Sequence, residues 1–444
     1  MLARFIYSLL LIASAPLVWI WIWLRARKTN SNWEIFAAER FGRYPQPWDG
    51  RPPIWVHAVS VGEVRAAVPL IQALLLRGEQ VLMTHMTPTG RAEARRLLAQ
   101  EISDGVVRQQ WIPYDFYGAM RRFIRHFSPH TVVLIEREVW PNLIQAATAS
   151  RVPVVLASAR LSERSARQTQ WINRLFGGLL KDTYAAISVV LAQTSDDAQR
   201  LFDAGATNVL VCGNLKFDVS LPVVAVQGGQ SWRERVARPT IVIASTREGE
   251  DARFVSLIAE YVGQSVGAHH GARVLFVLIP RHPQRFDQAA RLLDGTKLRY
   301  ARWSMLRDDP AAINVVKDLD VILGDTMGEL PFFYGASDVA IVGGSFEPHG
   351  GQNFIEASAI GIPVIVGPHT RNFKDAVVSA SHAGALVQVQ EPAQATEQAM
   401  KWLHEPDEAH KVGQAGKGWV ATHVGATARI MESLRAPEGD LVKP

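Results

Sequence analysis

Short apolar runs alternate along the chain with longer stretches in which apolar residues recur every three or four positions. In the first half of the body the runs are Ile54–Val59, Gln80–His85, Val106–Ile112, Thr131–Ile135, Pro153–Ala157, Ile187–Ala192 and Asn208–Cys212. In the second half they are Thr240–Ala244, Arg273–Ile279, Val321–Leu323, Asp338–Val342 and Pro363–Val366. Most are rich in Val and Ile, as in parallel strands buried on both faces. The pattern predicts an α/β protein with two doubly wound, Rossmann-like domains facing a central cleft.

The length of 444 residues fits two domains of about 200 residues each. We expect the first domain at residues 29–219 and the second at residues 239–413. Residues 220–238, which contain Pro222 and two adjacent glycines, are expected to form a linker. Residues 414–444 are expected to be a C-terminal helical segment.

The N-terminus has the composition of a membrane anchor. Phe5–Leu24 carries no charge, and about 20 apolar residues are enough for a helix to cross a bilayer. A cleaved signal peptide is the alternative, but no small-residue cleavage site follows the run. Its Trp-rich end suits a membrane interface, and more basic residues follow the run than precede it. We therefore expect residues 1–28 to anchor a cytoplasmic body, either by spanning the membrane or by lying in the interface.

Charge and cysteine content narrow the class of protein. The net charge is +5 and the pI is about 9.3, which favours anionic partners such as phosphates or acidic lipid surfaces. No strongly basic block is present, so nucleic acid is not an expected partner. Lone Cys212 excludes an internal disulfide and a Cys-rich metal site. The glycine-rich and His/Glu motifs of dehydrogenases, P-loop NTPases and zincins do not occur.

The segment Trp55–Gly78, WVHAVSVGEVRAAVPLIQALLLRG, passes from a predicted strand to a predicted helix through one acidic residue, Glu63. Ser60 and Glu63 have the S-x-x-E spacing of a capping box. Glu63 is alternatively a base that takes a proton from a substrate. The stretch Ala58–Gly62 is also one glycine short of the nucleophile elbow of serine hydrolases, with Ser60 as the nucleophile.

Two later loops are rich in groups that bind phosphate. Residues 280–285, PRHPQR, follow a predicted strand and present two guanidiniums, which match phosphate oxygens. Residues 343–363 contain four glycines before a helix that we expect to start near Gln352 and Asn353, so that its N–H groups face an anion. Glu356, about one turn later, can accept ribose hydroxyls. The alternatives are a solvated helix start and a plain turn.

Three charged motifs each have a structural alternative to a role in a site. Residues 136–138, Glu-Arg-Glu, and Lys216 follow apolar strands, and each is either edge solvation or part of a site. Residues 318–320, Asp-Leu-Asp, match the metal-binding D-x-D of some sugar transferases, but they precede a strand.

Several of these motifs occur together in one known family. The segments VHAVSVGE, EREVWPN, ASARLSERS, CGNLKFD, PRHPQRF, GDTMGEL, GGSFEPHGGQNFIEA and GPHTRNFKD resemble the 3-deoxy-D-manno-octulosonic acid (Kdo) transferases of lipopolysaccharide assembly. The resemblance runs from the anchor to about Asp375. It implies the GT-B fold, with an acceptor-binding domain at residues 29–219 and a donor-binding domain at residues 239–413. It also implies an inverting transfer of Kdo from CMP-Kdo to a lipid A precursor, lipid IVA, at the cytoplasmic face of the inner membrane, with no metal or other cofactor.

The resemblance also assigns roles to individual positions. Glu63 corresponds to the general base, and Glu136 and Lys216 to a pair that stabilises the transition state. The positions that correspond to CMP contacts are Pro280, Arg281, Met327, Gly328, Glu329, Asn353, Phe354, Ile355 and Glu356. The chain departs from the family pattern at residues 347–349, Glu-Pro-His, in the glycine-rich loop.

Three other functions stay open. A serine hydrolase would use Ser60 as its nucleophile, although Ala58 replaces the first glycine of that motif. A sugar-nucleotide epimerase would share the GT-B fold without needing a lipid anchor, and a membrane-bound protein that binds lipid A would catalyse nothing.

Overall fold

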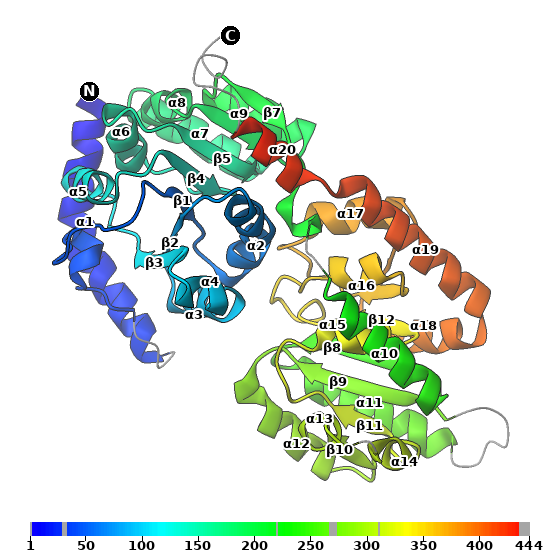
Figure 1. Cartoon of the computed structure of the whole chain (residues 1–444). Coiled ribbons are helices and arrows are strands. Elements are labelled where there is room, and N and C mark those ends of the chain that lie inside the picture. Colours follow the sequence, from blue (N-terminus) through cyan, green and yellow to red (C-terminus); the bar gives the residue numbers. More distant parts are fainter. Residues whose placement is uncertain (1, 29–32, 219–220, 266–272, 310, 435–444) are drawn as a thin grey trace. The chain divides into compact units, whose positions relative to one another are not determined.

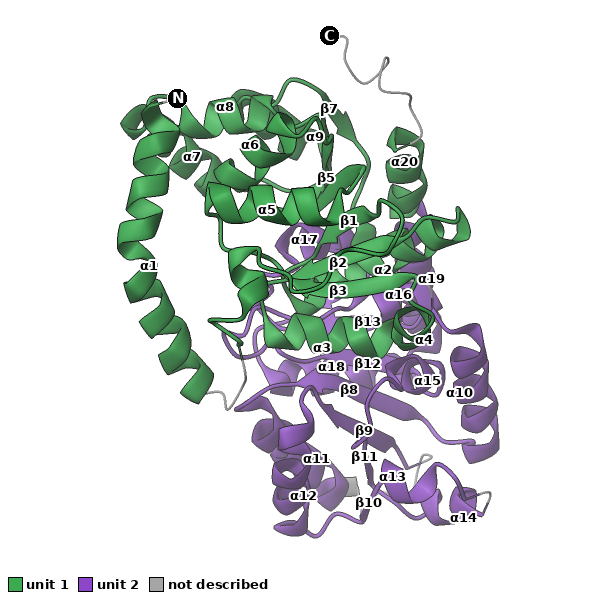
Figure 2. Cartoon of the chain, turned by 60° about the vertical axis from the view of Figure 1, so that its left-hand side comes forward, with its two compact units in different colours: residues 1–219, 423–444 green, residues 220–422 purple. Residues whose placement is uncertain are grey.

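The computed structural model describes residues 2–28, 33–218, 221–265, 273–309 and 311–434 (Figure 1). The chain forms two compact units, residues 1–219 with 423–444, and residues 220–422 (Figure 2). Each unit contains a seven-stranded sheet, and the pairs within both sheets are parallel. The expected pair of doubly wound α/β domains is confirmed.

The sheet of unit 1 has the order β3-β2-β1-β4-β5-β6-β7. Its strands are β1 (Ile54–His57), β2 (Val81–His85), β3 (Val107–Trp111), β4 (Thr131–Ile135), β5 (Val154–Ala159), β6 (Val189–Ala192) and β7 (Val209–Val211). Its helices are α1 (Leu2–Lys28), η1 (Ala38–Phe41), α2 (Val61–Leu76), α3 (Pro88–Leu97), α4 (Ala99–Ser103), α5 (Tyr117–Phe127), α6 (Pro141–Ala149), α7 (Glu163–Leu175), α8 (Leu179–Ala185), α9 (Ser195–Ala204), η2 (Leu215–Phe217) and α20 (Ala426–Ser433).

Helices cover both faces of this sheet, which explains the continuous apolar character of its strands. Successive residues of β1 show the two faces: Ile54 and Val56 pack with α2 and α20, whereas Trp55 packs with α5. All four residues of β1 are buried. A strand with helices on both sides cannot show the polar–apolar alternation of a half-exposed sheet.

The sheet of unit 2 has the order β10-β11-β9-β8-β12-β13-β14. Its strands are β8 (Thr240–Thr246), β9 (Leu275–Pro280), β10 (Tyr300–Arg302), β11 (Val321–Leu323), β12 (Val339–Val342), β13 (Val364–Val366) and β14 (Val387–Gln388). Its helices are α10 (Val223–Val236), α11 (Glu250–Ser265), η3 (Pro283–Arg285), α12 (Phe286–Asp294), α13 (Trp303–Leu306), α14 (Ala312–Val316), α15 (Leu330–Gly335), α16 (Ile355–Ile360), α17 (Lys374–His382) and α18 (Pro392–His404). Helix α19 (Pro406–His423) ends where the chain returns to unit 1.

The segment expected as a linker differs from the expectation. Most of residues 220–238 form helix α10, which packs on α15 within unit 2. A Cβ added to Gly229 would lie 2.0 Å from the carbonyl oxygen of Phe332. The glycine therefore permits the close approach of two helices, and it does not mark a flexible connection.

The expected C-terminal boundary also differs. Residue 414 lies inside α19, so the second unit continues through residue 422. Helix α20 then packs on α2 in the first unit, where Ile430 and Met431 join the core on that face of the sheet. The C-terminal segment is thus shared between the two units and does not form a separate element.

Candidate active site

The strand order of each unit marks one crevice at the carboxyl ends of its strands. In unit 1, β1 lies between β2 and β4. The connection after β1 leads to β2 on one side and the connection after β4 leads to β5 on the other side, so the two diverge. In unit 2, β8 lies between β9 and β12, and the connections after β8 and β12 diverge in the same way. Ligands of doubly wound proteins bind at such switch points. Both crevices are bordered by loops that the sequence identified, with Glu63 and Glu136 in unit 1 and residues 343–352 in unit 2.

Glu63 lies at the start of α2, and the capping box is confirmed. The Ser60 Oγ accepts the Glu63 amide at 3.5 Å. In return, Glu63 Oε2 accepts the amides of Val59 at 2.6 Å and Ser60 at 3.1 Å. One carboxylate oxygen is therefore fixed by the backbone, so the carboxyl group is held in one orientation. The hydroxyl of Ser60 serves as a helix cap, which is not the role that a serine nucleophile requires.

The surroundings of Glu63 suit a general base. Burial, followed by the like charges of Glu138 and Glu136, raises the pKa of the half-buried Glu63 carboxyl to about 7, against the opposing effect of the two amide hydrogen bonds. A general base is most effective when its pKa lies near the working pH. Capping and catalysis are therefore compatible for this residue, because the cap orients the group whose pKa the surroundings raise.

Glu136 and Lys216 form an ion pair beside the same crevice. Glu136 directly follows β4, and Lys216 lies in η2 after β7. Lys216 Nζ lies 2.6 Å from Glu136 Oε1, and both side chains are largely buried. Glu136 has φ +61°, a left-handed conformation that costs a non-glycine residue free energy and is concentrated at functional sites. The structure thus brings together two residues that lie 80 positions apart in the sequence.

Glu138 is a further acid of this crevice, and the sequence reasoning did not select it for the site. Its carboxylate accepts the Trp140 indole N–H at 2.9 Å. Burial is the main factor that raises its pKa. The signal in the sequence was the second acid of the Glu-Arg-Glu motif, which lies two residues after the first.

His57, at the end of β1, lies behind Glu138. Its Nδ1 is 2.8 Å from the Thr84 hydroxyl oxygen and 3.1 Å from the Thr84 carbonyl oxygen. Its Nε2 lies 4.0 Å from Glu138 Oε2. Burial lowers the pKa of His57 to about 3, so the imidazole is neutral at pH 7. A neutral imidazole adds no positive charge beside Glu63 and Glu138, which helps to keep their pKa values raised.

In unit 2, Arg281 belongs to a strongly positive cluster at the end of β9. Its amide donates to the Thr246 carbonyl at 2.9 Å, and its Nε donates to Gln352 Oε1 at 3.2 Å. The neighbouring His282 has its pKa lowered to about 4, by burial first and then by Arg247, Arg281 and Arg285. Guanidiniums that suppress protonation of a histidine produce the local field that a phosphate group requires.

The glycine-rich loop beside this cluster is held by Glu250, which sequence reasoning missed. Glu250 is fully buried. Its Oε2 accepts the amides of Arg247 at 2.8 Å and Gly344 at 2.6 Å, and its Oε1 accepts the amide of Phe346 at 2.8 Å. One carboxylate thereby joins the loops after β8 and β12, which border the switch point. In the sequence, Glu250 is an ordinary acid at the start of a helix.

Replacing Glu250 by Gln is expected to lower the free energy of unfolding by about 1–3 kcal/mol, because an amide NH₂ would face a backbone N–H that now donates to oxygen. Chemical denaturation would measure this loss. Glu260→Gln, on an exposed turn of the same helix α11, is the matched control and should change little. Equal stability of the two variants would contradict the anchoring role of Glu250.

The remaining predicted donor contacts lie at the same edge of the sheet, and their side chains have different surroundings. Met327 is exposed, Gly328 has φ +87°, and Glu329 accepts a hydrogen bond from the Thr326 hydroxyl. The side chains of Phe354 and Ile355 are buried in the core. These two residues therefore offer a ligand only their backbone groups.

The helix expected near Gln352 and Asn353 begins at Ile355 and is only six residues long. Asn353 Oδ1 accepts the Ile355 amide at 3.1 Å, and Asn353 Nδ2 donates to Glu356 Oε1 at 3.0 Å. One of the N–H groups expected to face an anion is therefore already bonded, and the two polar side chains hold each other in place.

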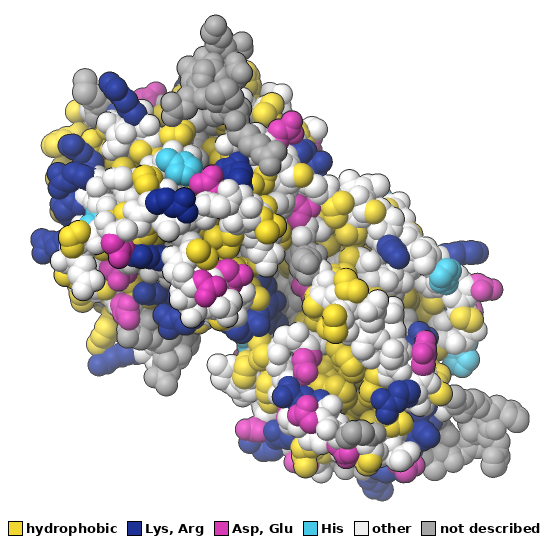
Figure 3. Space-filling view, in the orientation of Figure 1, with side chains coloured by type: hydrophobic (Ala, Val, Ile, Leu, Met, Phe, Trp, Pro, Cys, Tyr) yellow, Lys and Arg dark blue, Asp and Glu magenta, His cyan; other side chains and the backbone are white. Residues whose placement is uncertain are grey.

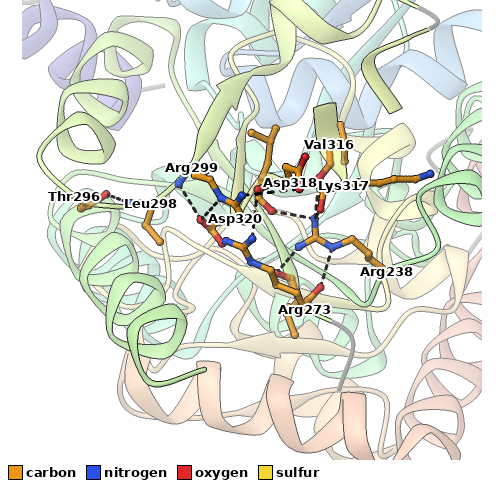
Figure 4. Close-up of polar contacts among 11 residues, drawn as sticks. Arg238, Arg273, Thr296, Leu298, Arg299, Val316, Lys317, Asp318 and Asp320 are labelled. Carbon is orange, nitrogen blue, oxygen red and sulfur yellow. Dashed lines mark hydrogen bonds and ion pairs between the residues drawn. The ribbon is translucent and has the colours of Figure 1, made fainter. Parts of the chain in front are cut away.

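The Asp-Leu-Asp motif lies at the other end of the sheet of unit 2. Asp320 directly precedes β11, whereas residues 327–329 follow it. Asp320 is buried, contacts the guanidinium of Arg273 and accepts the amide of Arg299 at 2.9 Å (Figure 4). Arg238 closes this network by donating to three backbone carbonyls before β11. The motif ties loops together at the amino ends of the strands, a structural role.

Comparison with known proteins adds two family models. The model described as 3-deoxy-D-manno-octulosonic-acid transferase matches residues 37–219, and the model of glycosyl transferases group 1 matches residues 308–419. The chain is 49% identical to the 3-deoxy-D-manno-octulosonic acid transferase of Bordetella pertussis, over 98% of this chain and 99% of that protein. It is 32% identical to the enzyme of the same name from Haemophilus influenzae, over 97% and 98% of the two chains.

Two solved structures share the fold. UDP-GlcNAc 2-epimerase from Neisseria meningitidis, bound to UDP-GlcNAc, has a TM-score of 0.54 at 17% identity and covers 86% of this chain and 99% of its own. MurG from Acinetobacter baumannii has a TM-score of 0.51 at 14% identity, covering 87% and 99%. At such identities the likeness concerns the two-domain GT-B architecture alone.

Proposed function

The chain belongs to the 3-deoxy-D-manno-octulosonic acid transferase family, a family of Kdo-transferring glycosyltransferases, and we propose that it moves Kdo from CMP-Kdo to a lipid A precursor, lipid IVA, with Glu63 as the general base. Unit 1 binds the acceptor and unit 2 binds CMP-Kdo. The observation that carries the proposal is the Glu63 carboxylate, which the backbone orients and whose pKa its buried, acidic surroundings raise to about 7.

The reaction is a single displacement with inversion. Glu63 takes the proton of an acceptor hydroxyl while the hydroxyl oxygen bonds to the anomeric carbon of Kdo. The bond from that carbon to the phosphate oxygen of CMP breaks, and its electron pair leaves with CMP. Arg281 and the neighbouring guanidiniums of Arg247 and Arg285, which add to the effect of burial in lowering the pKa of His282, supply positive charge for the leaving phosphate.

The Glu136–Lys216 pair stabilises the transition state. Lys216 carries a positive charge, and Glu136 holds its ammonium group at 2.6 Å. A charge that is positioned before the reaction stabilises developing charge without reorganising at the moment of transfer. Glu138, bonded to Trp140, helps to keep the pKa of Glu63 near neutrality by its like charge.

Arg281→Ala is expected to weaken CMP binding by roughly 10- to 150-fold, because a charge-assisted contact to phosphate contributes about 1.5–3 kcal/mol. Calorimetric titration with CMP measures the change. Arg291→Ala is the matched control, since Arg291 is an exposed arginine of α12 in the same unit. If both variants bound CMP as the unmodified protein does, Arg281 would not belong to the donor site.

Adding EDTA is expected to leave the rate of Kdo transfer nearly unchanged, because the guanidiniums around Arg281 meet the phosphate charge. The Asp320 carboxylate is bound by Arg273 and by the Arg299 amide. The assay compares initial rates with and without chelator, followed by addition of magnesium or manganese. A loss of rate that either metal restores would support a metal site at residues 318–320 or elsewhere.

The membrane supplies the acceptor in this proposal. Helix α1 is long and apolar enough to cross a membrane, with a mean hydropathy of 2.1 in its most apolar window. Basic residues follow its apolar run, which supports a catalytic body on the cytoplasmic side of the inner membrane. An anchored enzyme stays beside an acidic glycolipid that does not leave the bilayer.

A further inference from the structure

One side of helix α1 is seated on unit 1 along most of its length. Six of the less exposed residues of the helix recur at intervals of three or four positions, which places them on one face: Ser8, Leu11, Ala15, Trp19, Ile22 and Ala26. Ala15 and Ile22 are buried. In Figure 1, α1 runs beside the rest of unit 1, where it contacts α6.

The first part of this seam is polar. The Tyr7 hydroxyl donates to Asp115 Oδ2 at 2.9 Å, and the Ser8 hydroxyl donates to Asn142 Oδ1 at 3.2 Å. Asp115 also accepts the amides of Asn142 at 3.1 Å and Leu143 at 2.8 Å, at the start of α6. The Asp115 carboxylate thus binds both the first amides of α6 and the Tyr7 hydroxyl of α1.

The later part of the seam is aromatic. The Trp19 ring lies 5.4 Å from Phe36, 5.9 Å from Phe41 and 5.8 Å from Tyr114 between ring centroids. The guanidinium of Arg25 lies 5.7 Å from the ring centroid of Trp33. Tyr7 and Trp19 are about 18 Å apart along the helix axis at about 1.5 Å per residue. Contacts with unit 1 therefore occur near both ends of the helix.

The exposed side chains of α1 are largely apolar in the part of the helix that the structure describes. Leu2 is 73% exposed and Leu17 is 71% exposed, and Phe5, Leu9, Ile12 and Leu24 are exposed as well. So large an apolar face on a folded unit marks a surface that binds a membrane or another protein.

We infer that α1 does not span the bilayer and instead lies in the plane of one membrane leaflet, with its seam on unit 1 and its apolar face in the lipid. This inference rests on the membrane attachment proposed above and specifies its geometry. A spanning helix of this length, about 33 Å from Leu2 to Leu24, would fill the hydrocarbon thickness of about 30 Å. The parts of unit 1 that contact α1 between Tyr7 and Arg25 would then have to enter the hydrocarbon.

The charges of unit 1 near α1 favour the leaflet surface over the hydrocarbon. Helix α5 carries the exposed Arg121, Arg122 and Arg125. Arg122 donates to the Phe41 carbonyl at 2.6 Å, and the Phe41 ring contacts Trp19 of α1. Figure 3 shows Lys and Arg side chains gathered at the edge of unit 1 where α1 and α5 lie in Figure 1. Arginines are costly inside a bilayer but bind anionic head groups at its surface.

The test measures the depth of single positions of α1 in vesicles of phosphatidylethanolamine and phosphatidylglycerol. In full-length protein with Cys212→Ala, a fluorophore is attached to Leu2→Cys, Ile12→Cys, Leu17→Cys or Leu24→Cys. Nitroxide lipids labelled near the head group or deep in the acyl chain then quench the fluorophore. Leu76→Cys is the control, because this residue is 90% exposed at the end of α2 in the same unit.

The inference predicts similar quenching at all four positions, stronger with the shallow nitroxide, and little quenching at position 76. If position 12 were quenched mainly by the deep nitroxide and positions 2 and 24 by the shallow one, the helix would span the bilayer. That result would overturn the inference and leave the membrane attachment intact. If neither nitroxide quenched any of the four positions, as would happen if a second copy of the chain covered the apolar face, both the inference and the membrane attachment would be wrong.

Discussion

Glu63→Gln is expected to lower the rate of Kdo transfer by roughly 10²–10⁴-fold, the usual cost of losing general base catalysis. Glutamine is nearly isosteric and can accept the same amides of Val59 and Ser60 through its side-chain oxygen. Its neutral amide cannot take the proton of an acceptor hydroxyl. The variant should therefore fold, bind CMP with unchanged affinity and transfer almost no Kdo.

The melting temperature of Glu63→Gln is a control, because the direction of its change can be predicted. Folding raises the pKa of Glu63 from its ordinary value to about 7, so the folded protein binds this proton more tightly than the unfolded chain does. Ionised Glu63 therefore reduces stability as the pH rises from the ordinary carboxyl range through about 7. Gln removes that effect, so the melting temperature at pH 8 should be equal to or higher than that of the unmodified protein.

Ser60→Ala separates capping from catalysis in the opposite direction. It removes the side chain that accepts the Glu63 amide and should lower stability by about 0.5–2 kcal/mol, with turnover largely retained.

The pH dependence of Kdo transfer adds a second test. In the unmodified protein, kcat/KM should fall below about pH 7 as Glu63 becomes protonated. Near-normal transfer by Glu63→Gln would remove Glu63 as the base.

Lys216→Ala is expected to lower kcat by roughly 10²–10³-fold, the cost typical of removing one preorganised group that stabilises the transition state. The Nζ of Lys216 lies 2.6 Å from Glu136, so the two residues act as one unit. Glu136→Gln should also be slow, and the double variant should be little slower than Lys216→Ala, because residues that act together are non-additive.

Loss of the pair also affects folding, and the two effects need separate measurements. Removing one partner of a largely buried ion pair leaves an uncompensated charge and can cost about 3–5 kcal/mol. Denaturation curves and CMP titrations for each variant show whether it is folded at the assay temperature. Lys181→Ala, an exposed lysine of α8, is the matched control. If folded Lys216→Ala transferred Kdo as fast as this control, the pair would be structural only.

Most strands of the two sheets were predictable because burial on both faces of a strand produces a short apolar run. The two strands that the pattern missed, β10 (Tyr300–Arg302) and β14 (Val387–Gln388), are short and lie at the edges of their sheet. Their residues are half-buried or exposed, so they lack the apolar signal.

The positions of the site residues were predictable from their place after strands, but their partners were not. Lys216 meets Glu136, and Glu250 meets Gly344, only because the strand order brings distant loops together. Tertiary contacts also decide the structure of the expected linker. Its adjacent glycines indicate a turn when read alone, but Gly229 lets helix α10 pack closely against Phe332. Local sequence shows which residue types are available, and the tertiary fold decides what they contact.

Side-chain direction was the other feature that sequence could not supply. Phe354 and Ile355 belong to the motif that resembles the CMP site, yet both side chains lie in the core. Their neighbours Asn353 and Glu356 bond to each other through their side chains. Helical period alone does not settle this in a six-residue helix, because fewer than two turns leave too few positions to define a buried face.

The mass of the lipid after incubation of the full-length protein with CMP-Kdo and a tetra-acylated lipid A precursor tests most directly whether the protein transfers Kdo. The proposed reaction predicts lipid that gains Kdo in step with CMP release, at a rate that falls with Glu63→Gln and is retained with Ser60→Ala. Lipid of unchanged mass, whether CMP-Kdo is left intact or is cleaved to free Kdo, would contradict the assignment of this chain as the enzyme that joins Kdo to lipid A.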